Sequence, residues 1–288
     1  MELEADGRHV EVLRASLNLD GSAAKGVDTP RVKRSEAEAF AALQEPKLNP
    51  RDTTTYRSGT MRLSYLAQDR ADVQEAAKCL AQHMKDPNES DMRDLKRAVR
   101  YLIKYPRAVL KYEEQDVPQE VHGWVDSDYA GDVVCRKSTS GVVVMYGSHC
   151  LKTSSTVQEP IGLSSGESEY YAAVRGGTTL LGLASLMQDW KIECKPILVL
   201  KTDSSAAKGF ACRQGLGRNR HVSTRFLWLQ AAVATKRLKI QKVSTKDQLG
   251  DMLTKPMTQQ WLQRIFPRMS IEFKHGQAAV QKKALLRT

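Results

Sequence analysis

The sequence predicts an α/β protein with a mixed five-stranded sheet flanked by helices, preceded by a small, mainly helical segment. Two observations predict this class. Residues 121–148 form a valine-rich hairpin pattern with a turn at Gly131 and Asp132, and β-branched residues are enriched in strands. After the hairpin, strand patterns alternate with helical patterns. A hairpin followed by this alternation predicts both strand orientations in one sheet, with helices packed on both faces.

Composition limits the class of protein. The 288 residues fit about two domains, and the net charge of +11 suits a polyanionic partner. The five cysteines are scattered without a CxxC pair, which indicates reduced thiols in an intracellular protein and disfavours a zinc site. The acidic start MELEAD is not typical of a signal peptide, and the sequence shows no apolar run of membrane-spanning length. We therefore expect no membrane partner, and the cytoplasm and the nucleus both stay open.

The chain before the hairpin divides into two parts. Residues 1–55 are polar and contain several glycines and prolines, so we expect loops with little regular structure, disordered in part. Residues 56–117 contain helical patterns at 73–84 and 95–102, with apolar residues at helical spacing. The second helix carries basic residues that indicate either a solvated face or, with less weight, a nucleic-acid contact: Lys96, Arg97, Arg100 and Lys104.

The hairpin carries two acids near the end of its first strand. Asp126 and Asp128 lie two residues apart, so a strand would point both to the same face. Because acids are depleted in strands, they need an explanation. Taken alone, an exposed edge strand explains them as well as a functional site does. Residues 141–146 form the second strand, and residues 150–155 form a third.

Further acids lie where the later elements begin or end. Ser164 and Glu167 form a capping-box signature for a helix that runs to about residue 190. Asp203 ends a strand and begins a helix, and the last acid, Asp251, lies in a closing helix. The patterns predict strands at 197–202 and 238–243, helices at 221–235 and 261–266, and caps for the closing helix at Thr245 and Gln248.

The amino-acid sequences of five short motifs, called phrases below, resemble the ribonuclease H domain of copia-type LTR retrotransposon polyproteins. The phrases follow the family's order and span roughly residues 121–256: DSDYAGD, RKSTSG, LSSGESEY, TDSSAA and DQLGDMLTK. A weaker resemblance, over residues 56–67, is to the thumb-like end of a copia-type reverse transcriptase. The chain contains no Asp-Asp pair, so polymerase activity is not expected.

The resemblance implies a division of the chain and a fold for its larger part. Residues 56–117 are expected to form a helical segment like the thumb and connection of a reverse transcriptase, and residues 118–270 a ribonuclease H-like domain. Composition alone predicts an irregular segment at residues 1–55 and a basic tail at residues 271–288.

The resemblance also implies a metal-dependent endonuclease that cuts the RNA strand of RNA–DNA hybrids. Its cofactors are two Mg²⁺ or Mn²⁺ ions, with no small-molecule cofactor, and the rest of a reverse transcriptase is a further possible partner. The implied catalytic metal ligands are Asp126, Glu169, Asp203 and Asp251. Carboxylate oxygens are the hard ligands that such ions prefer. Two ions about 4 Å apart activate water and stabilise the leaving oxygen of a phosphodiester, and without cations the carboxylates would repel one another.

Where two acids are close in sequence, the resemblance selects one. Glu167 and Glu169 lie about 200° apart around a helix, so both cannot serve. The family pattern selects Glu169 and leaves Glu167 as a cap. It also selects Asp126 over Asp128, which shares its face. Asp203 has no neighbouring acid, although a simple helix cap is its local alternative.

The last pair is Asp247 and Asp251, four residues apart on one face of the predicted helix. The helix macrodipole alone explains Asp247, and the resemblance selects Asp251. The sequence departs from the family's usual motif at Tyr129, where Trp is frequent. It also departs at Gly250, where Ala is usual, which weakens a helix. No histidine lies between the last strand and Asp251, where other ribonuclease H families place a catalytic one.

Residues near the acids are candidates for contacts with the phosphates of the hybrid: Arg136, Lys137, Ser138, Arg213, Arg218 and Arg220. His221 lies at the family's Lys/Arg-His pair, and a structural role and a substrate contact are equally open for it. Groove width and the 2′-hydroxyl would distinguish the RNA of a hybrid from DNA.

Two other functions compete with this one. A retroviral-type integrase shares the sheet but carries its acids in the order Asp, Asp, Glu. Here Glu169 comes second, which disfavours an integrase. A catalytically inactive, nucleic-acid-binding remnant of a retrotransposon polyprotein stays open, because intact ligands do not prove activity.

Overall fold

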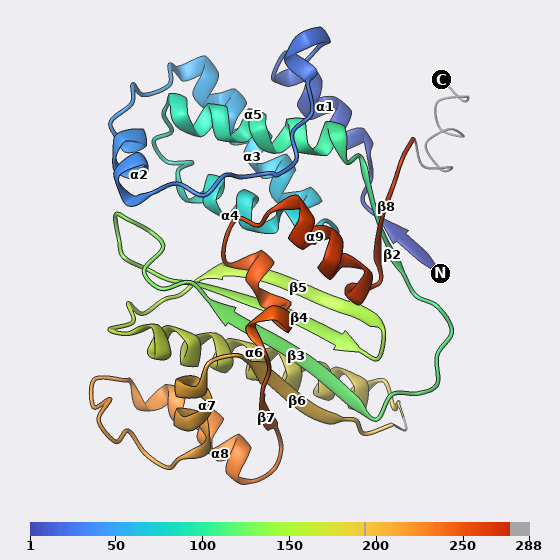
Figure 1. The fold of residues 1–288 in the computed structure, drawn as a ribbon, viewed down its shortest axis with the longest axis vertical. Coiled ribbons are helices and arrows are strands. Elements are labelled where there is room, and N and C mark those ends of the chain that lie inside the picture. The colour runs from blue at the N-terminus through green and yellow to red at the C-terminus, as the bar shows by residue number, and fades with distance from the viewer. Residues whose placement is uncertain (193, 277–288) are drawn as a thin grey trace. The chain divides into compact units, whose positions relative to one another are not determined.

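The chain folds into two compact units in a computed structural model that describes residues 1–192 and 194–276, with the backbone alone at Ser22 and Ala23 (Figure 1). One unit comprises residues 113–254, and the other comprises residues 1–112 together with residues 255–276. Residues 255–270, which the sequence analysis joined to the ribonuclease H-like domain, thus cluster with the N-terminal unit. Within the part of the chain that the structure describes, no helix is long and apolar enough to cross a membrane.

The unit 113–254 is built on a five-stranded sheet with the order β5-β4-β3-β6-β7 (Figure 1). β4 lies antiparallel to both β3 and β5, whereas β6 runs parallel to both β3 and β7. The predicted mixed sheet flanked by helices is therefore confirmed. The strands are β3 (Glu120–Ser127), β4 (Thr139–Tyr146), β5 (His149–Val157), β6 (Ile197–Thr202) and β7 (Lys239–Lys242).

One face of this sheet packs against the long helix α6 (Ser165–Asp189). A Cβ atom at Gly176 would lie 2.2 Å from a methyl carbon of Val125, so this glycine permits a close approach of the helix to β3. α7 (Ser205–Cys212) and α8 (Trp228–Ala234) complete the same apolar core. Burial of these apolar side chains is the main stabilising contribution to the unit.

The opposite face of β3 and β4 packs against a short 3₁₀ turn, η5 (Gly250–Leu253), where the sequence predicted an α-helix. The prediction of one closing helix with Asp247 and Asp251 on a common face is wrong. η4 (Thr245–Asp247) ends at Gln248, which has an extended backbone with ψ of 109°. The buried Gln248 amide donates to the Val125 carbonyl at 2.9 Å, and this bond to β3 outweighs the local preference for a continuous helix. Asp247 is consequently exposed, whereas Asp251 is buried.

The other unit packs several helices around a second apolar core. Its elements include α1 (Arg8–Ser16), α2 (Glu36–Leu43), α3 (Pro50–Leu66), α4 (Gln74–Gln82), α5 (Glu89–Lys104) and α9 (Gln259–Ile265). A three-stranded antiparallel sheet joins β1 (Glu2–Glu4), β2 (Arg107–Lys111) and β8 (Ile271–Lys274).

The expectation of little regular structure in residues 1–55 is wrong, because β1, α1, α2 and the start of α3 lie there. Leu13 of α1 is fully buried among residues of α3 and α5, so this helix depends on distant parts of the chain. The expected basic tail begins instead with β8, which pairs with β2. The rest of that tail, residues 277–288, lies outside the described residues.

The basic residues of α5 hold another segment of the same unit. Arg97 donates to the Thr29 hydroxyl at 2.9 Å, Arg100 to the Lys25 carbonyl at 2.7 Å, and Lys104 to the Asp28 carboxylate at 2.5 Å. These three side chains thus fix residues 25–29 against the helix, while Lys104 stays exposed to solvent.

Candidate functional site

Three carboxylates gather at one edge of the five-stranded sheet. Asp126 lies near the end of β3, Asp203 follows β6, and Glu169 lies in α6. Each offers an oxygen atom, and these three atoms lie within 4.8 Å of one another. Because β3 and β6 are parallel neighbours, their carboxyl ends meet at the same edge, where open α/β sheets commonly bind ligands. The donor set consists of carboxylates alone, which suits a hard divalent cation.

Asp126 is held by the turn that follows β7. Its side chain is buried, and the Thr254 hydroxyl donates to its carboxylate. A Cβ atom at Gly250 would lie 2.8 Å from the Cβ of Asp126, and one at Gly141 would lie 2.7 Å from the Gly250 carbonyl oxygen. The two glycines therefore let the turn approach both strands closely. The sequence analysis missed Thr254 and Gly141, although both lie within the phrases that carry the family resemblance.

Asp251 lies in the same turn, one residue after Gly250. Asp251 is buried, and its backbone carbonyl oxygen accepts a hydrogen bond from the Thr254 hydroxyl at 3.2 Å. It is not a member of the group formed by Asp126, Glu169 and Asp203. Among the described residues, the structure thus assembles three of the four predicted metal ligands as one group.

Glu167 and Glu169 have different environments. Glu169 joins the carboxylate group, whereas the side chain of Glu167 is only 2% exposed. The Glu167 carboxylate accepts hydrogen bonds from the Tyr171 hydroxyl at 2.5 Å, the Leu163 amide at 3.0 Å and His221 Nε2 at 2.8 Å. Burial raises the pKa of Glu167, but these hydrogen bonds more than offset it and hold the pKa below its ordinary value.

The start of α6 is capped differently from the predicted capping box. The Ser164 hydroxyl accepts from the Glu167 amide at 3.2 Å, which is half of the motif. The Glu167 carboxylate binds the amide of Leu163, not that of Ser164. A buried side chain that the sequence analysis did not consider, Gln158, donates to the Ser127 hydroxyl and the Ser168 carbonyl. It links the end of β3 to the turn of α6 that carries Glu169.

Asp203 does not serve as the cap of α7. That position belongs to Ser204, whose hydroxyl accepts from the Ala207 amide at 3.1 Å. The local alternative for Asp203 therefore loses its support. Asp128 lies outside the group, because its carboxylate accepts from the Thr139 amide across the hairpin connection. Asp132 binds the amides of the same connection in a similar way.

The predicted phosphate-contact residues divide into exposed and structural ones. Arg136, Arg218 and Arg220 are exposed, and Lys137 is half-buried. The two others have internal roles. Ser138 is buried and accepts from the Ala130 amide, and Arg213 donates to the Leu216 carbonyl while its guanidinium lies 4.2 Å from the Phe210 ring centroid.

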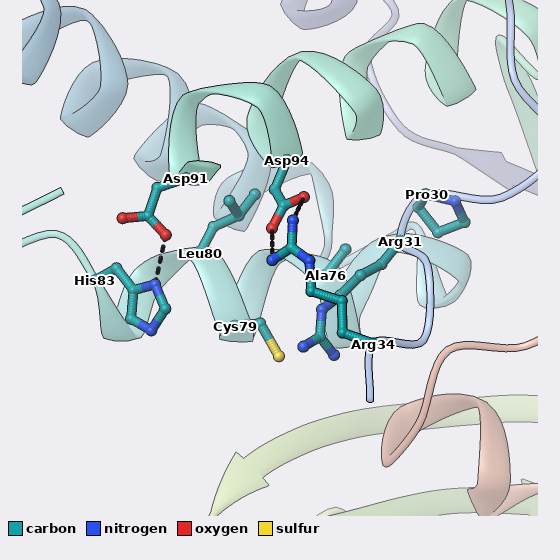
Figure 2. A pocket seen from close by; sticks show the side chains of 9 residues that line it. All are labelled: Pro30, Arg31, Arg34, Ala76, Cys79, Leu80, His83, Asp91 and Asp94. Carbon is teal, nitrogen blue, oxygen red and sulfur yellow. Dashed lines mark hydrogen bonds and ion pairs between the residues drawn. The ribbon is translucent and has the colours of Figure 1, made fainter. Parts of the chain in front are cut away.

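Figure 2 shows a pocket in the helical unit, between α4, α5 and the segment that precedes α2. Three side-chain pairs lie in or beside it: Arg34–Asp94 at 2.8 Å, His83–Asp91 at 2.6 Å and Arg31–Glu75 at 2.5 Å. Because its charged groups contact one another, they hold the segment 31–34 against the two helices. We assign this pocket a structural role.

The chain is similar in sequence to known retrotransposon proteins. It is 30% identical over 258 residues to the retrovirus-related Pol polyprotein from transposon RE2 of Arabidopsis thaliana, covering 88% of this chain and 17% of that protein. It is 29% identical over 250 residues to the corresponding polyprotein from transposon RE1 of the same plant, covering 86% and 17%. Over most of its length, the chain is homologous to copia-type Pol polyproteins. The resemblance inferred from the sequence phrases is confirmed.

The chain spans only 17% of the length of these Pol polyproteins. No family model matches it. A solved structure of LC11-RNase H1, isolated from compost, is 16% identical with a TM-score of 0.34, covering 47% of this chain and 93% of that one.

Proposed function

We propose that the unit 113–254 is a retrotransposon-type ribonuclease H that hydrolyses the RNA strand of RNA–DNA hybrids endonucleolytically. The observation that carries the proposal is the group formed by Asp126, Glu169 and Asp203, whose oxygens lie within 4.8 Å of one another. The homology of the chain to Pol polyproteins supports the choice of a nucleic acid as substrate. The net charge of +11 is consistent with that choice.

The division of the chain is part of this proposal. We assign residues 118–270 to the ribonuclease H-like domain and residues 56–117 to the end of a reverse transcriptase. Residues 1–55 and 271–288 are flanking segments. The compact units divide the chain at residues 112 and 254 instead. The catalytic group lies within 113–254 under either division.

The site fits divalent metal ions by its donor chemistry. Asp126, Glu169 and Asp203 would hold a Mg²⁺ or Mn²⁺ ion, and Asp251 would complete the site for a second. When bound, two such ions activate a water molecule and stabilise the leaving oxygen of a phosphodiester. The chain itself contributes position, because Thr254 fixes Asp126 and Gln158 fixes the turn that carries Glu169.

The exposed basic residues would bind the hybrid. Arg136, Arg218 and Arg220 are exposed and would contact phosphates, which set position on a duplex but carry no sequence information. We leave Ser138 and Arg213 out of this interface, because both are engaged within the unit. Recognition of the RNA strand would then depend on groove width and the 2′-hydroxyl.

The test is a cleavage assay on an internally labelled RNA–DNA hybrid, with Mg²⁺ and with a chelator. We expect internal cuts in the RNA strand that require Mg²⁺ and are absent with a DNA duplex of the same sequence. Asp126→Asn is the matched loss-of-function variant. Hybrid binding without cleavage by the wild-type protein would instead support the alternative, a catalytically inactive nucleic-acid-binding remnant.

A further inference from the structure

A buried carboxylate in the first turn of α6 contacts a histidine far along the chain. Glu167 lies two residues before Glu169, and its side chain is 2% exposed. It accepts from His221 Nε2 at 2.8 Å across 54 residues of sequence. The His221 side chain is itself 43% exposed, so this contact joins the interior to the surface. Glu167 is outside the carboxylate group, and its role in that site is therefore indirect.

His221 belongs to the loop 213–223, which connects α7 to the 3₁₀ turn η3 (Thr224–Leu227). Both ends of this loop are anchored without His221. At one end, the Gln230 side chain accepts from the Gly215 amide at 2.9 Å and donates to its carbonyl at 3.1 Å. At the other end, Val222 is buried in the core, and the Tyr170 hydroxyl donates to the Phe226 carbonyl at 2.8 Å.

The part of the loop between these anchors carries two arginines. Arg218 and Arg220 are exposed, and within the described residues neither forms an ion pair with an acidic side chain. The Asn219 amide donates to the Leu216 carbonyl, and the Val222 amide to the Asn219 carbonyl, so the arginines lie on consecutive tight turns. His221 directly follows Arg220, and its side chain contacts Glu167 of α6.

We propose that the His221–Glu167 contact is a positioning pair that holds Arg218 and Arg220 beside the start of α6, where they bind phosphates of the nucleic acid next to the carboxylate group. The proposal rests on the proposed function for its ligand and decides between the two roles left open for His221. His221 acts through the loop and does not contact the reacting atoms. A loop held in one conformation loses less entropy on binding than a mobile one.

His221→Ala tests the pair because it removes the contact while the anchors at Gln230, Val222 and Tyr170 remain. Tyr171→Phe is the matched control, since it removes another hydrogen bond to the same carboxylate and leaves the loop untouched. His221→Gln keeps an N–H donor and should restore part of the effect. A cooperative thermal unfolding transition in each of the three variants would establish that they are folded.

The first measurement is the affinity for a labelled RNA–DNA hybrid without divalent ions, over a range of salt concentrations. We expect His221→Ala to lower affinity on the order of tenfold and to reduce the slope of log K against log salt by up to about 2, as for two phosphate contacts. Replacing Arg218 and Arg220 with alanine should give the same loss. Combining this with His221→Ala should add little, since residues that act as a unit are not additive. Tyr171→Phe should bind as the wild type does.

The second measurement needs no nucleic acid. Trypsin should cut after Arg218 several times faster in His221→Ala than in the wild type or in Tyr171→Phe. A His221→Ala protein with wild-type affinity and a wild-type rate of cutting would refute the positioning pair. A wild type that neither binds nor cleaves the hybrid would refute the proposed function and the binding role. Even then, the trypsin rate alone would decide whether His221 holds the loop.

Discussion

Gly141→Ala should disturb the site without touching a carboxylate. A Cβ atom at residue 141 would lie 2.7 Å from the Gly250 carbonyl oxygen and 2.9 Å from the Thr254 methyl carbon. Ordinary contact begins at 3.4 Å, so the turn 250–254 must move away from β4 by roughly 0.7 Å, the difference between these distances, as in other overpacked interiors. The contacted atom at Gly250 belongs to the backbone, so a change of rotamer cannot relieve the contact.

The displacement should affect both stability and activity. Overpacking of this kind costs about 1–3 kcal/mol in the free energy of unfolding. It also moves Thr254, whose hydroxyl holds the Asp126 carboxylate. A misplacement of about 1 Å at a reacting centre can reduce the rate on the order of a hundredfold. We therefore expect a cleavage rate reduced about ten- to a hundredfold, together with a modest loss of stability.

The assay combines urea unfolding with single-turnover cleavage of a labelled hybrid, so that binding does not limit the rate. Gly182→Ala is the matched control, because a Cβ atom there meets nothing within 4 Å and the residue is exposed on α6. That control should gain up to about 1 kcal/mol in stability from helix propensity and keep its cleavage rate. A Gly141→Ala protein with wild-type stability and rate would refute the argument from close approach.

Three other outcomes are expected. Glu169→Gln should abolish cleavage. Glu167→Gln should lower the free energy of unfolding by about 1–3 kcal/mol and retain cleavage at a saturating concentration of hybrid. Equal loss of cleavage in both variants would show that the wrong acid was selected. Asp203→Asn should keep the melting temperature, because another residue caps α7, and should bind hybrid but not cut it; a wild-type cutting rate would contradict its assignment. At pH 8, Ellman's reagent should modify the exposed Cys135 but spare Cys150 until urea unfolds the protein, since burial raises the pKa of the Cys150 thiol to about 12.

The sheet could be predicted because its signals are local. The β-branched run in β4 and the alternation of strands and helices after it depend on neighbouring residues alone. The break at Gln248 could not be predicted, because it depends on a hydrogen bond to Val125, 123 residues away. The helices of the first 55 residues were not predicted, for a similar reason. α1 is stabilised by burial of Leu13 in a core formed by distant helices, and short helices are marginal without such packing.

Within the site, the sequence indicated the acids better than their roles. The phrases selected Asp126, Glu169 and Asp203, and these three form the group that the structure assembles. The sequence left a helix cap open as the alternative role of Asp203, because an Asp side chain can accept from the first turn; in the structure Ser204 fills that position. It also treated Gly250 only as a weak helix residue. In the structure its missing side chain leaves room for Asp126, a constraint that arises only when β3 and the final turn meet.

The acids of the hairpin and of α6 have two different roles: some bind backbone amides, and others belong to the carboxylate group. Asp128, Asp132 and Glu167 accept hydrogen bonds from backbone amides of turns and helix starts, which are donors that need partners wherever regular pairing ends. Asp126 and Glu169, their neighbours in sequence, form the group with Asp203. A carboxylate that binds backbone amides fixes the local backbone, and the neighbouring carboxylate is thereby placed within reach of a cation. Substitution of an amide-binding acid should therefore change affinity and stability, whereas substitution of an acid of the carboxylate group should change the chemical step.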